Sequence, residues 1–279
     1  MASIQTNNSA IVALQNLRTV NRNLSVVQEQ ISTGKKISNA KDNASIYAIS
    51  TVIKSDVEGF KRISDSLNLG TSTVAVARGA AEQVTDILTQ IKGLVVQSQE
   101  ANVDRTKIQA DVTQLTNQVD SIVNAAQFNG LNLVKAATGT VTFLASLDRD
   151  AAGTVTASSI SVAAQSLETG AGGGLAALAT IDVSTAAGAA SALTAIEGLV
   201  QTAIDAAASF GSSQKRIETQ NEFVRQLTDA LTSGIGALTD ADLEEASARL
   251  QSLQVQQQLG VQALSIANQS PQSILALFR

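Results

Sequence analysis

The chain has 279 residues, of which 44% are hydrophobic and 15% charged, so it is long enough to bury a sizeable core. It contains no histidine and no cysteine, which excludes thiol nucleophiles, disulfides, imidazole bases and the usual zinc, copper and haem ligands. The net charge of -5 opposes binding to phosphates. We therefore expect no cofactor, no catalytic residues and no nucleic-acid partner.

The first segment, residues 3–33, carries apolar side chains at helical spacing. They are Ile4, Ile11, Leu14, Leu17, Val20, Leu24, Val27 and Ile31. Such a stripe predicts an amphipathic helix. A cleaved secretion signal would need a basic region followed by an unbroken apolar run, and a membrane span would need about 18 apolar residues. The sequence shows neither pattern, so we expect no cleaved signal and no membrane insertion.

The next region contains a long heptad repeat. Every seventh residue from Ile46 to Val95 is apolar, which predicts one helix of about 50 residues. Two apolar registers between residues 108 and 126 predict a shorter helix that returns antiparallel, and Asn129-Gly130 marks a turn after it. The heptad resumes at Ile196 and predicts a third helix from about 190 to 233, which packs with the others in a rod-like bundle.

The region between these helices, residues 138–190, has a different composition. Alternating Thr-Val-Thr segments predict short strands. The glycine run at residues 170–174 lacks the Lys-Ser/Thr pair of a phosphate-binding loop, so a flexible loop is favoured. We predict a small strand-and-loop insertion.

The last segment is expected to begin at Thr239, because Gly234 and Gly236 interrupt the preceding helical pattern and Thr239 with Asp242 resembles a capping box. Its apolar face comprises Leu243, Leu250, Leu253, Leu259, Leu264 and Ile266. The interspersed glutamines form either a solvated face or, as we favour, a polar lining between subunits.

Carboxylates gather at the start of this segment, at Asp240, Asp242, Glu244 and Glu245. They could hold a metal ion or act as an acid/base pair. A helix dipole favours carboxylates in the first turn in any case, and we prefer that explanation. Neither terminal stripe has a partner in the predicted bundle, so we expect the two to pack against each other and against other copies of the chain.

Three stretches of this sequence resemble bacterial flagellins: residues 3–50, from SIQTNNSAIVALQNL to NASIYAIS, the central QFNGLNL, and the C-terminal ASARLQSLQVQQQLGVQALSIANQSPQSILALFR. The resemblance implies a mostly α fold, with a coiled coil built from both chain ends. The inner assembly domain would be residues 1–45 with 240–279, the rod 46–140 with 190–239, and a reduced variable insertion 141–189. One departure is Asn43, where the family usually has a second aspartate after Asp42. A turn is still expected there.

The resemblance implies a structural subunit that self-assembles into the extracellular flagellar filament for swimming. Its partners would be other flagellin subunits, the hook-junction and cap proteins and an export chaperone, and export would proceed without a cleaved signal. The residues expected to make subunit contacts are Ile4, Ile11, Leu14, Leu17, Leu24, Ile31, Leu243, Leu250, Leu253, Leu259, Leu264, Ile266, Leu277 and Phe278.

The sequence leaves three alternatives to the filament subunit to consider. A hook-filament junction protein shares its end sequences with flagellins, but the close C-terminal match favours the filament subunit. A metallopeptidase in the insertion would need the His-Glu-x-x-His motif, which a chain without histidine cannot contain. A secreted binding module would need a well-packed insertion, and the richness in glycine and alanine argues against one.

A further implied site is the helical segment that an innate immune receptor binds in flagellins, which resembles Leu-Gln-Arg-Val-Arg-Glu-Leu-x-x-Gln. The corresponding residues here are Leu88, Gln90, Lys92, Gly93, Leu94 and Gln97. The apolar frame agrees, but glutamine, lysine and glycine replace the family's two arginines and its glutamate. Since hydrogen bonds to charged groups contribute about 1.5–3 kcal/mol each, we expect poor activation of the receptor.

Overall fold

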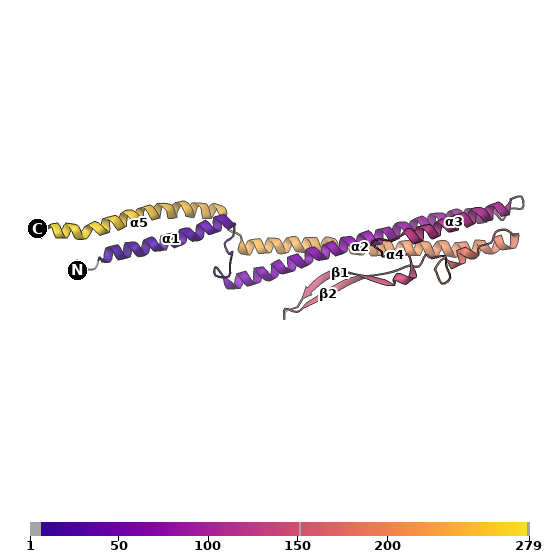
Figure 1. The fold of residues 1–279 in the computed structure, drawn as a ribbon, viewed down its shortest axis with the longest axis horizontal. Helices are drawn as coiled ribbons and strands as arrows, with labels where there is room; N and C mark the ends of the chain where they lie inside the picture. Colours follow the sequence, from indigo (N-terminus) through magenta and orange to yellow (C-terminus); the bar gives the residue numbers. More distant parts are fainter. Residues whose placement is uncertain (1–6, 151, 278–279) are drawn as a thin grey trace. The chain divides into compact units, whose positions relative to one another are not determined.

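The structure, a computed structural model, describes residues 7–150 and 152–277, with side chains through residue 269. The described part is mostly α-helical and contains one two-stranded antiparallel sheet (Figure 1), which confirms the predicted fold class. The chain forms two compact units. One combines the chain up to Val57 with the chain from Ala230 onward, and the other comprises Glu58–Asp229.

The first unit joins the two ends of the chain. Helices α1 (Asn8–Thr33) and α5 (Leu243–Leu277) run side by side in it (Figure 1). The side chain of Asn7 caps α1 by accepting a hydrogen bond from the Ala10 N–H (3.1 Å), and Gly34 ends the helix in the left-handed conformation (φ 67°), which glycine adopts without strain. The unit also contains the start of α2 (Ala44–Gln97) and the end of α4 (Ala186–Thr239).

The expected start of the last helix was wrong. Helix α4 continues through Gly234 and Gly236 to Thr239, because a helical glycine costs only about 1 kcal/mol relative to alanine. The Thr239 hydroxyl donates back to the Ile235 carbonyl within α4 instead of capping the next helix. The cap of α5 is Asp242, whose carboxylate accepts from the N–H groups of Glu244 (3.0 Å) and Glu245 (3.1 Å).

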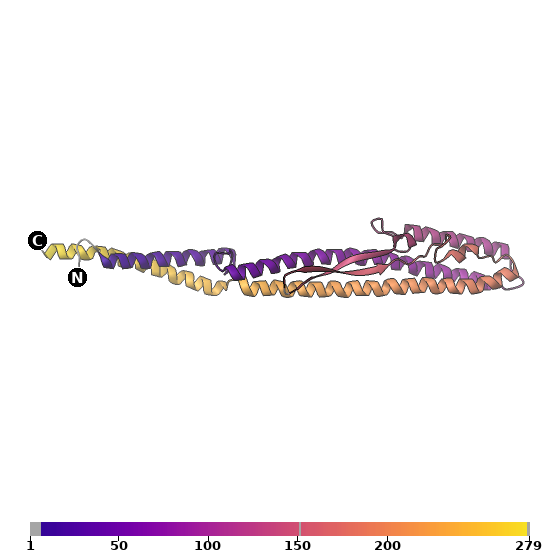
Figure 2. The same ribbon diagram turned by 90° about the horizontal axis from the view of Figure 1, so that it is seen from below.

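The second unit buries the predicted heptad seams. The fully or almost fully buried seam residues are Leu67, Val74, Ala81, Leu88 and Val95 of α2 and Ile196, Ala203, Phe210, Ile217 and Val224 of α4. Helix α3 (Arg105–Ala125) folds back along α2, as predicted (Figure 2). Polar pairs also join α2 to α4, since Asn221 accepts from the Ser64 hydroxyl (2.7 Å) and donates to the Asn68 side chain (2.7 Å).

The predicted insertion lies against these helices as a β-hairpin. Strands β1 (Thr140–Arg149) and β2 (Val155–Ala163) pair antiparallel (Figure 2). The pairing has a bulge between Leu144 and Ser146. The Phe143 ring sits directly over Gly70 of α2, where an added Cβ would lie 2.9 Å from ring carbons. The Gln220 side chain of α4 donates to the Ala145 carbonyl (3.0 Å). The hairpin is therefore packed on α2 and hydrogen-bonded to α4.

The glycine run after the hairpin forms a compact turn and not the loose loop that its composition suggested. An added Cβ at Gly173 would lie 2.0 Å from the Glu168 carbonyl oxygen, and one at Gly174 would lie 2.2 Å from that of Ser166. The Gly173 N–H donates to the Gly170 carbonyl (2.9 Å). These glycines are there because no side chain fits.

Helix α4 alone among the described helices is long and apolar enough, by length and composition, to cross a membrane. This is weak evidence for a span, because the core helix of a bundle passes the same test. The buried seam of α4, from Ile196 to Val224, packs in the second unit. The expectation of no membrane insertion stays a prediction.

Candidate assembly surface

The two terminal helices pair antiparallel through a seam with coiled-coil spacing. Its most buried members are Val27 of α1 and Ala246 and Ala267 of α5, which are at most 9% exposed. Two hydrogen bonds fix the register: the Asn7 amide donates to the Ala267 carbonyl (2.7 Å), and the Gln257 amide donates to the Asn21 side chain (2.8 Å).

A glycine in this seam allows close approach of the two helices. A Cβ at Gly260 of α5 would lie 3.2 Å from the Cδ1 of Leu17 in α1. The Leu17 side chain therefore packs against a position where a larger residue would push the helices apart. The pairing of α1 with α5 is specified by shape as well as by apolar character.

The predicted contact residues divide into two groups. The first group is half-buried and comprises Leu17, Leu24, Ile31, Leu250, Leu253 and Leu264. The second group is exposed and comprises Ile11, Leu14, Leu243, Leu259 and Ile266. Ile4 and Phe278 lie outside the described residues, as does the side chain of Leu277. A single stripe was expected on each helix, whereas the structure turns part of each stripe toward solvent.

Exposed apolar residues on α5 form a stripe on the side opposite the seam, which we call the outer stripe. It consists of Val255, Leu259 and Ile266, which are 55%, 58% and 70% exposed. Their spacing of four and seven residues places them on one helix face. Val255 was not among the contact residues expected from the sequence. Nor were three exposed valines outside the outer stripe, namely Val12 and Val26 of α1 and Val261 of α5. The four-residue spacing between Val255 and Leu259 was the signal that could have found the stripe.

The glutamines of α5 are mostly on the surface. Gln251, Gln254, Gln256, Gln258 and Gln262 are exposed, whereas Gln257 is half-buried at the seam and bonds to α1. Within one chain, the segment is thus a solvated face. The predicted polar lining between subunits stays a prediction.

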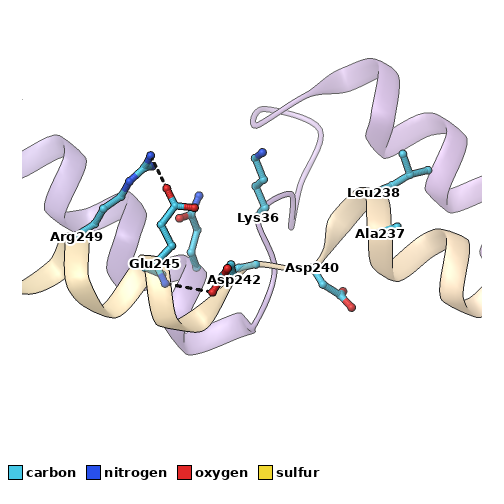
Figure 3. Close-up of a pocket in the computed structure, with 10 residues that line it drawn as sticks. Lys36, Ala237, Leu238, Asp240, Asp242, Glu245 and Arg249 are labelled. Carbon is cyan, nitrogen blue, oxygen red and sulfur yellow. Dashed lines mark hydrogen bonds and ion pairs between the residues drawn. The ribbon is translucent and has the colours of Figure 1, made fainter.

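The connection between α4 and α5 lies against the loop after α1. The Lys36 N–H donates to the Thr239 carbonyl (2.7 Å), and the Ala241 N–H donates to the Gly34 carbonyl (3.0 Å). A pocket beside this crossing is lined by Lys36, Asp240, Asp242, Glu245 and Arg249, among others (Figure 3).

The carboxylates at this pocket do not converge on one point. Glu245 pairs with Arg249 (2.9 Å), Asp242 caps α5, and Asp240 points away from both (Figure 3). Among the described residues, no group of three or more possible ligands is arranged to hold a metal ion. The geometry favours helix capping and local pairing as the role of this acidic group.

The loop before α2 forms the predicted turn around Asp42. Its carboxylate accepts hydrogen bonds from the N–H groups of Ser38 (2.9 Å) and Asn39 (3.1 Å), and these bonds, that of Ser38 first, lower the pKa of Asp42. Asn43 caps α2 by accepting from the Ile46 N–H (3.1 Å). An amide thus serves as the cap where the family usually has a carboxylate.

The candidate immune-receptor segment lies on α2 within the second unit. Leu88 is fully buried, Leu94 is half-buried, and Gln90, Gly93 and Gln97 are exposed. Their spacing of three and four residues places these exposed positions on one face. Lys92 pairs with Glu197 of α4 (2.5 Å), so its ammonium is already engaged within the chain.

These features define a helical structural protein whose chain ends pair with each other and still expose apolar surface. Residues 4–139 match the bacterial flagellin N-terminal helical region, and residues 193–278 match the bacterial flagellin C-terminal helical region. The chain belongs to the bacterial flagellin family, and it is a structural subunit of the flagellar filament.

Full-length relatives agree with this assignment. Over 99% of its length, the chain is 41% identical to flagellin FljM of Caulobacter vibrioides and covers 98% of that protein. It is 36% identical to flagellin C of Rhizobium meliloti and 38% identical to a flagellin of Brucella melitensis, with complete coverage of all the chains compared. These relatives give no support to the junction-protein alternative.

Solved structures show the same fold at greater distance. A Vibrio parahaemolyticus protein assigned as flagellar hook-associated matches with a TM-score of 0.55 and 14% identity, over 71% of this chain and all of that one. At this identity, the likeness concerns the fold alone and does not decide between filament and junction proteins.

Proposed function

We propose that this flagellin polymerises through the outer faces of its paired terminal helices. The α1–α5 seam closes within each subunit, and the outer stripe of α5 together with Ile11, Leu14 and Leu243 contacts neighbouring copies. The single observation that carries the proposal is that Leu259 and Ile266 stay 58% and 70% exposed although α1 and α5 are already paired. Water-exposed apolar surface of this kind is characteristic of contacts between proteins.

The symmetry of a filament supports the assignment of the seam to contacts within a subunit and of the outer stripe to contacts between subunits. An open helical polymer requires unlike patches to meet head to tail, since a self-complementary patch would close a dimer. The α1–α5 pair offers unlike patches: the outer stripe on one side, and a groove lined by Val26, Val27 and Leu253 on another. Burial of the outer stripe removes apolar area from water and so stabilises the contact between subunits by about 25 cal/mol per Å² of that area.

We extend the proposal to the domain layout, the export route and the other partner proteins, which the flagellin family suggests. Residues 1–45 with 240–279 would form the inner assembly domain, 46–140 with 190–239 the rod, and 141–189 the variable insertion. The subunit would leave the cell without a cleaved signal, escorted by an export chaperone, and would meet the hook-junction and cap proteins at the filament ends. Its role would be mechanical, without catalysis.

Seeded polymerisation of purified protein tests the proposal, with Leu259→Asp as the variant and Ser247→Asp as the control. Ser247 is also exposed on α5 but lies off the outer stripe. A carboxylate buried in an apolar contact costs several kcal/mol, so we expect Leu259→Asp to raise the critical concentration at least about tenfold. Helical content of the monomer should be unchanged. Normal filaments from Leu259→Asp would contradict the proposal.

The receptor segment supports a second, narrower proposal, that this flagellin activates the innate immune receptor poorly. Gln90 and Gly93 are exposed on one helix face, so a partner would meet an amide and a bare backbone where the family presents an arginine and a glutamate. Lys92 pairs with Glu197, and its ammonium lacks the planar fork of donors that the missing guanidinium would present.

A further inference from the structure

We propose that Asn129 is a site of spontaneous deamidation in the folded protein. Asn129 and Gly130 form the tip of the turn after α3, with φ angles of 50° and 83°. This is the one Asn-Gly pair in the sequence. The inference concerns a chemical modification and does not depend on how the subunit assembles.

The reaction requires an unhindered backbone nitrogen beside an asparagine side chain. The deprotonated Gly130 nitrogen attacks the Cγ of Asn129, a C–N bond forms, and the side-chain nitrogen leaves as ammonia. Water then opens the resulting five-membered imide at either carbonyl, which leaves an aspartate or an isoaspartate at position 129. The balance is the gain of one water and the loss of one ammonia, and no other reactant is needed.

The surroundings of Asn129 leave both reacting groups free. Within the described part of the chain, neither the Asn129 carboxamide nor the Gly130 N–H makes a hydrogen bond to protein. Both residues are exposed, and an added Cβ at Gly130 would meet nothing within 4 Å. A glycine at this position does not shield its nitrogen and leaves the backbone free to move toward the side chain.

A neighbouring asparagine serves as an internal control. Asn132 is 8% exposed, its amide donates to the Val123 carbonyl (2.7 Å), and its side-chain oxygen accepts from the Val134 N–H (3.0 Å). The branched side chain of Leu133 follows it. Asn132 is therefore locked by two hydrogen bonds, whereas Asn129 is not.

Modification would alter the turn itself. Phe128 and Leu131 close it with reciprocal backbone hydrogen bonds of 2.8 and 3.0 Å. An isoaspartate would add one carbon to the backbone between them and strain this closure. An aspartate would add one negative charge to a surface loop.

Peptide mapping of the aged full-length protein tests the inference. Trypsin releases the stretch from Ile108 to Lys135 as one peptide, which contains both Asn129 and Asn132. After incubation of the folded protein at mildly alkaline pH, we expect a gain of one mass unit at Asn129, isoaspartate at that position, and no change at Asn132. The conversion should accelerate as pH rises, because the attacking nitrogen must lose its proton.

Variants make the result decisive. Gly130→Ala should slow the conversion strongly, and Asn129→Gln should abolish it, because a glutamine would have to close a larger ring. If Gly130→Ala is too strained to fold, the pH dependence of the unmodified protein carries the same information. An unconverted Asn129 in folded protein, under conditions that convert the isolated tryptic peptide, would overturn the proposal. Equal conversion at Asn132 would overturn it too.

Discussion

The contact between Phe143 of the hairpin and Gly70 of α2 makes Gly70→Ala an informative change. A Cβ at Gly70 would lie 2.9 Å from two carbons of the Phe143 ring, which is 6% exposed and cannot swing into solvent without unpacking the hairpin. Gly79 lies on the same helix with nothing within 4 Å of its added Cβ. Gly79→Ala is therefore a matched control.

The magnitude follows from two opposing terms. Alanine stabilises a helical position by about 1 kcal/mol relative to glycine, and this gain applies at both sites. Overpacking a filled site costs about 1–3 kcal/mol, and this cost applies only at Gly70. We expect Gly79→Ala to raise the free energy of unfolding by about 1 kcal/mol. Gly70→Ala should leave it unchanged or lower it by up to about 2 kcal/mol.

Urea unfolding of the monomer, followed by circular dichroism, measures both variants. A second substitution, Phe143→Leu, removes the ring, so in that background Gly70→Ala should stabilise the protein by about 1 kcal/mol, as Gly79→Ala does. If Gly70→Ala stabilised the protein as much as Gly79→Ala, the hairpin would not be packed on α2 at Gly70.

Two further predictions concern the loop before α2 and the receptor segment. Because the pKa of Asp42 is lowered in the folded protein, its ionised carboxylate stabilises the fold at pH values above the ordinary pKa of 3.8. This stabilisation is lost as the pH falls through the lowered pKa of the folded protein. Asp42→Asn should therefore make the urea midpoint less sensitive to pH below about 4, and an unchanged acid dependence would refute this. The double change Gln90→Arg, Gly93→Glu should increase the potency of purified monomer in a receptor-reporter assay by about ten- to a hundredfold, if one charged hydrogen bond is regained. Equal potency of the two proteins would show that these positions do not set recognition.

The long helices were predictable because their signal is periodic. Ile196, Phe210 and Val224 recur at multiples of seven, and all three are buried where the heptad pattern places them. The Asn129-Gly130 turn was equally predictable, since the structure places both residues at positive φ.

The boundaries and the outer faces were less predictable. Gly234 and Gly236 suggested a helix end, but the cost of glycine in a helix is small, so neighbouring helical residues override it. The terminal stripes contain apolar residues on two sides of each helix, and the sequence alone does not say which side the partner helix covers. That choice depends on three-dimensional fit, such as that of Leu17 against Gly260.

Thiol protection tests the central claim most directly, because the native chain has no cysteine and any introduced one is a unique probe. Leu259→Cys places the probe on the outer stripe, and Leu264→Cys places it in the half-buried α1–α5 seam. The rate of maleimide labelling is then compared between monomer and filament. We expect position 259 to react rapidly in the monomer and to be protected in the filament, and position 264 to react slowly in both. Equally rapid labelling of position 259 in monomer and filament would contradict the assignment of the outer stripe to subunit contacts.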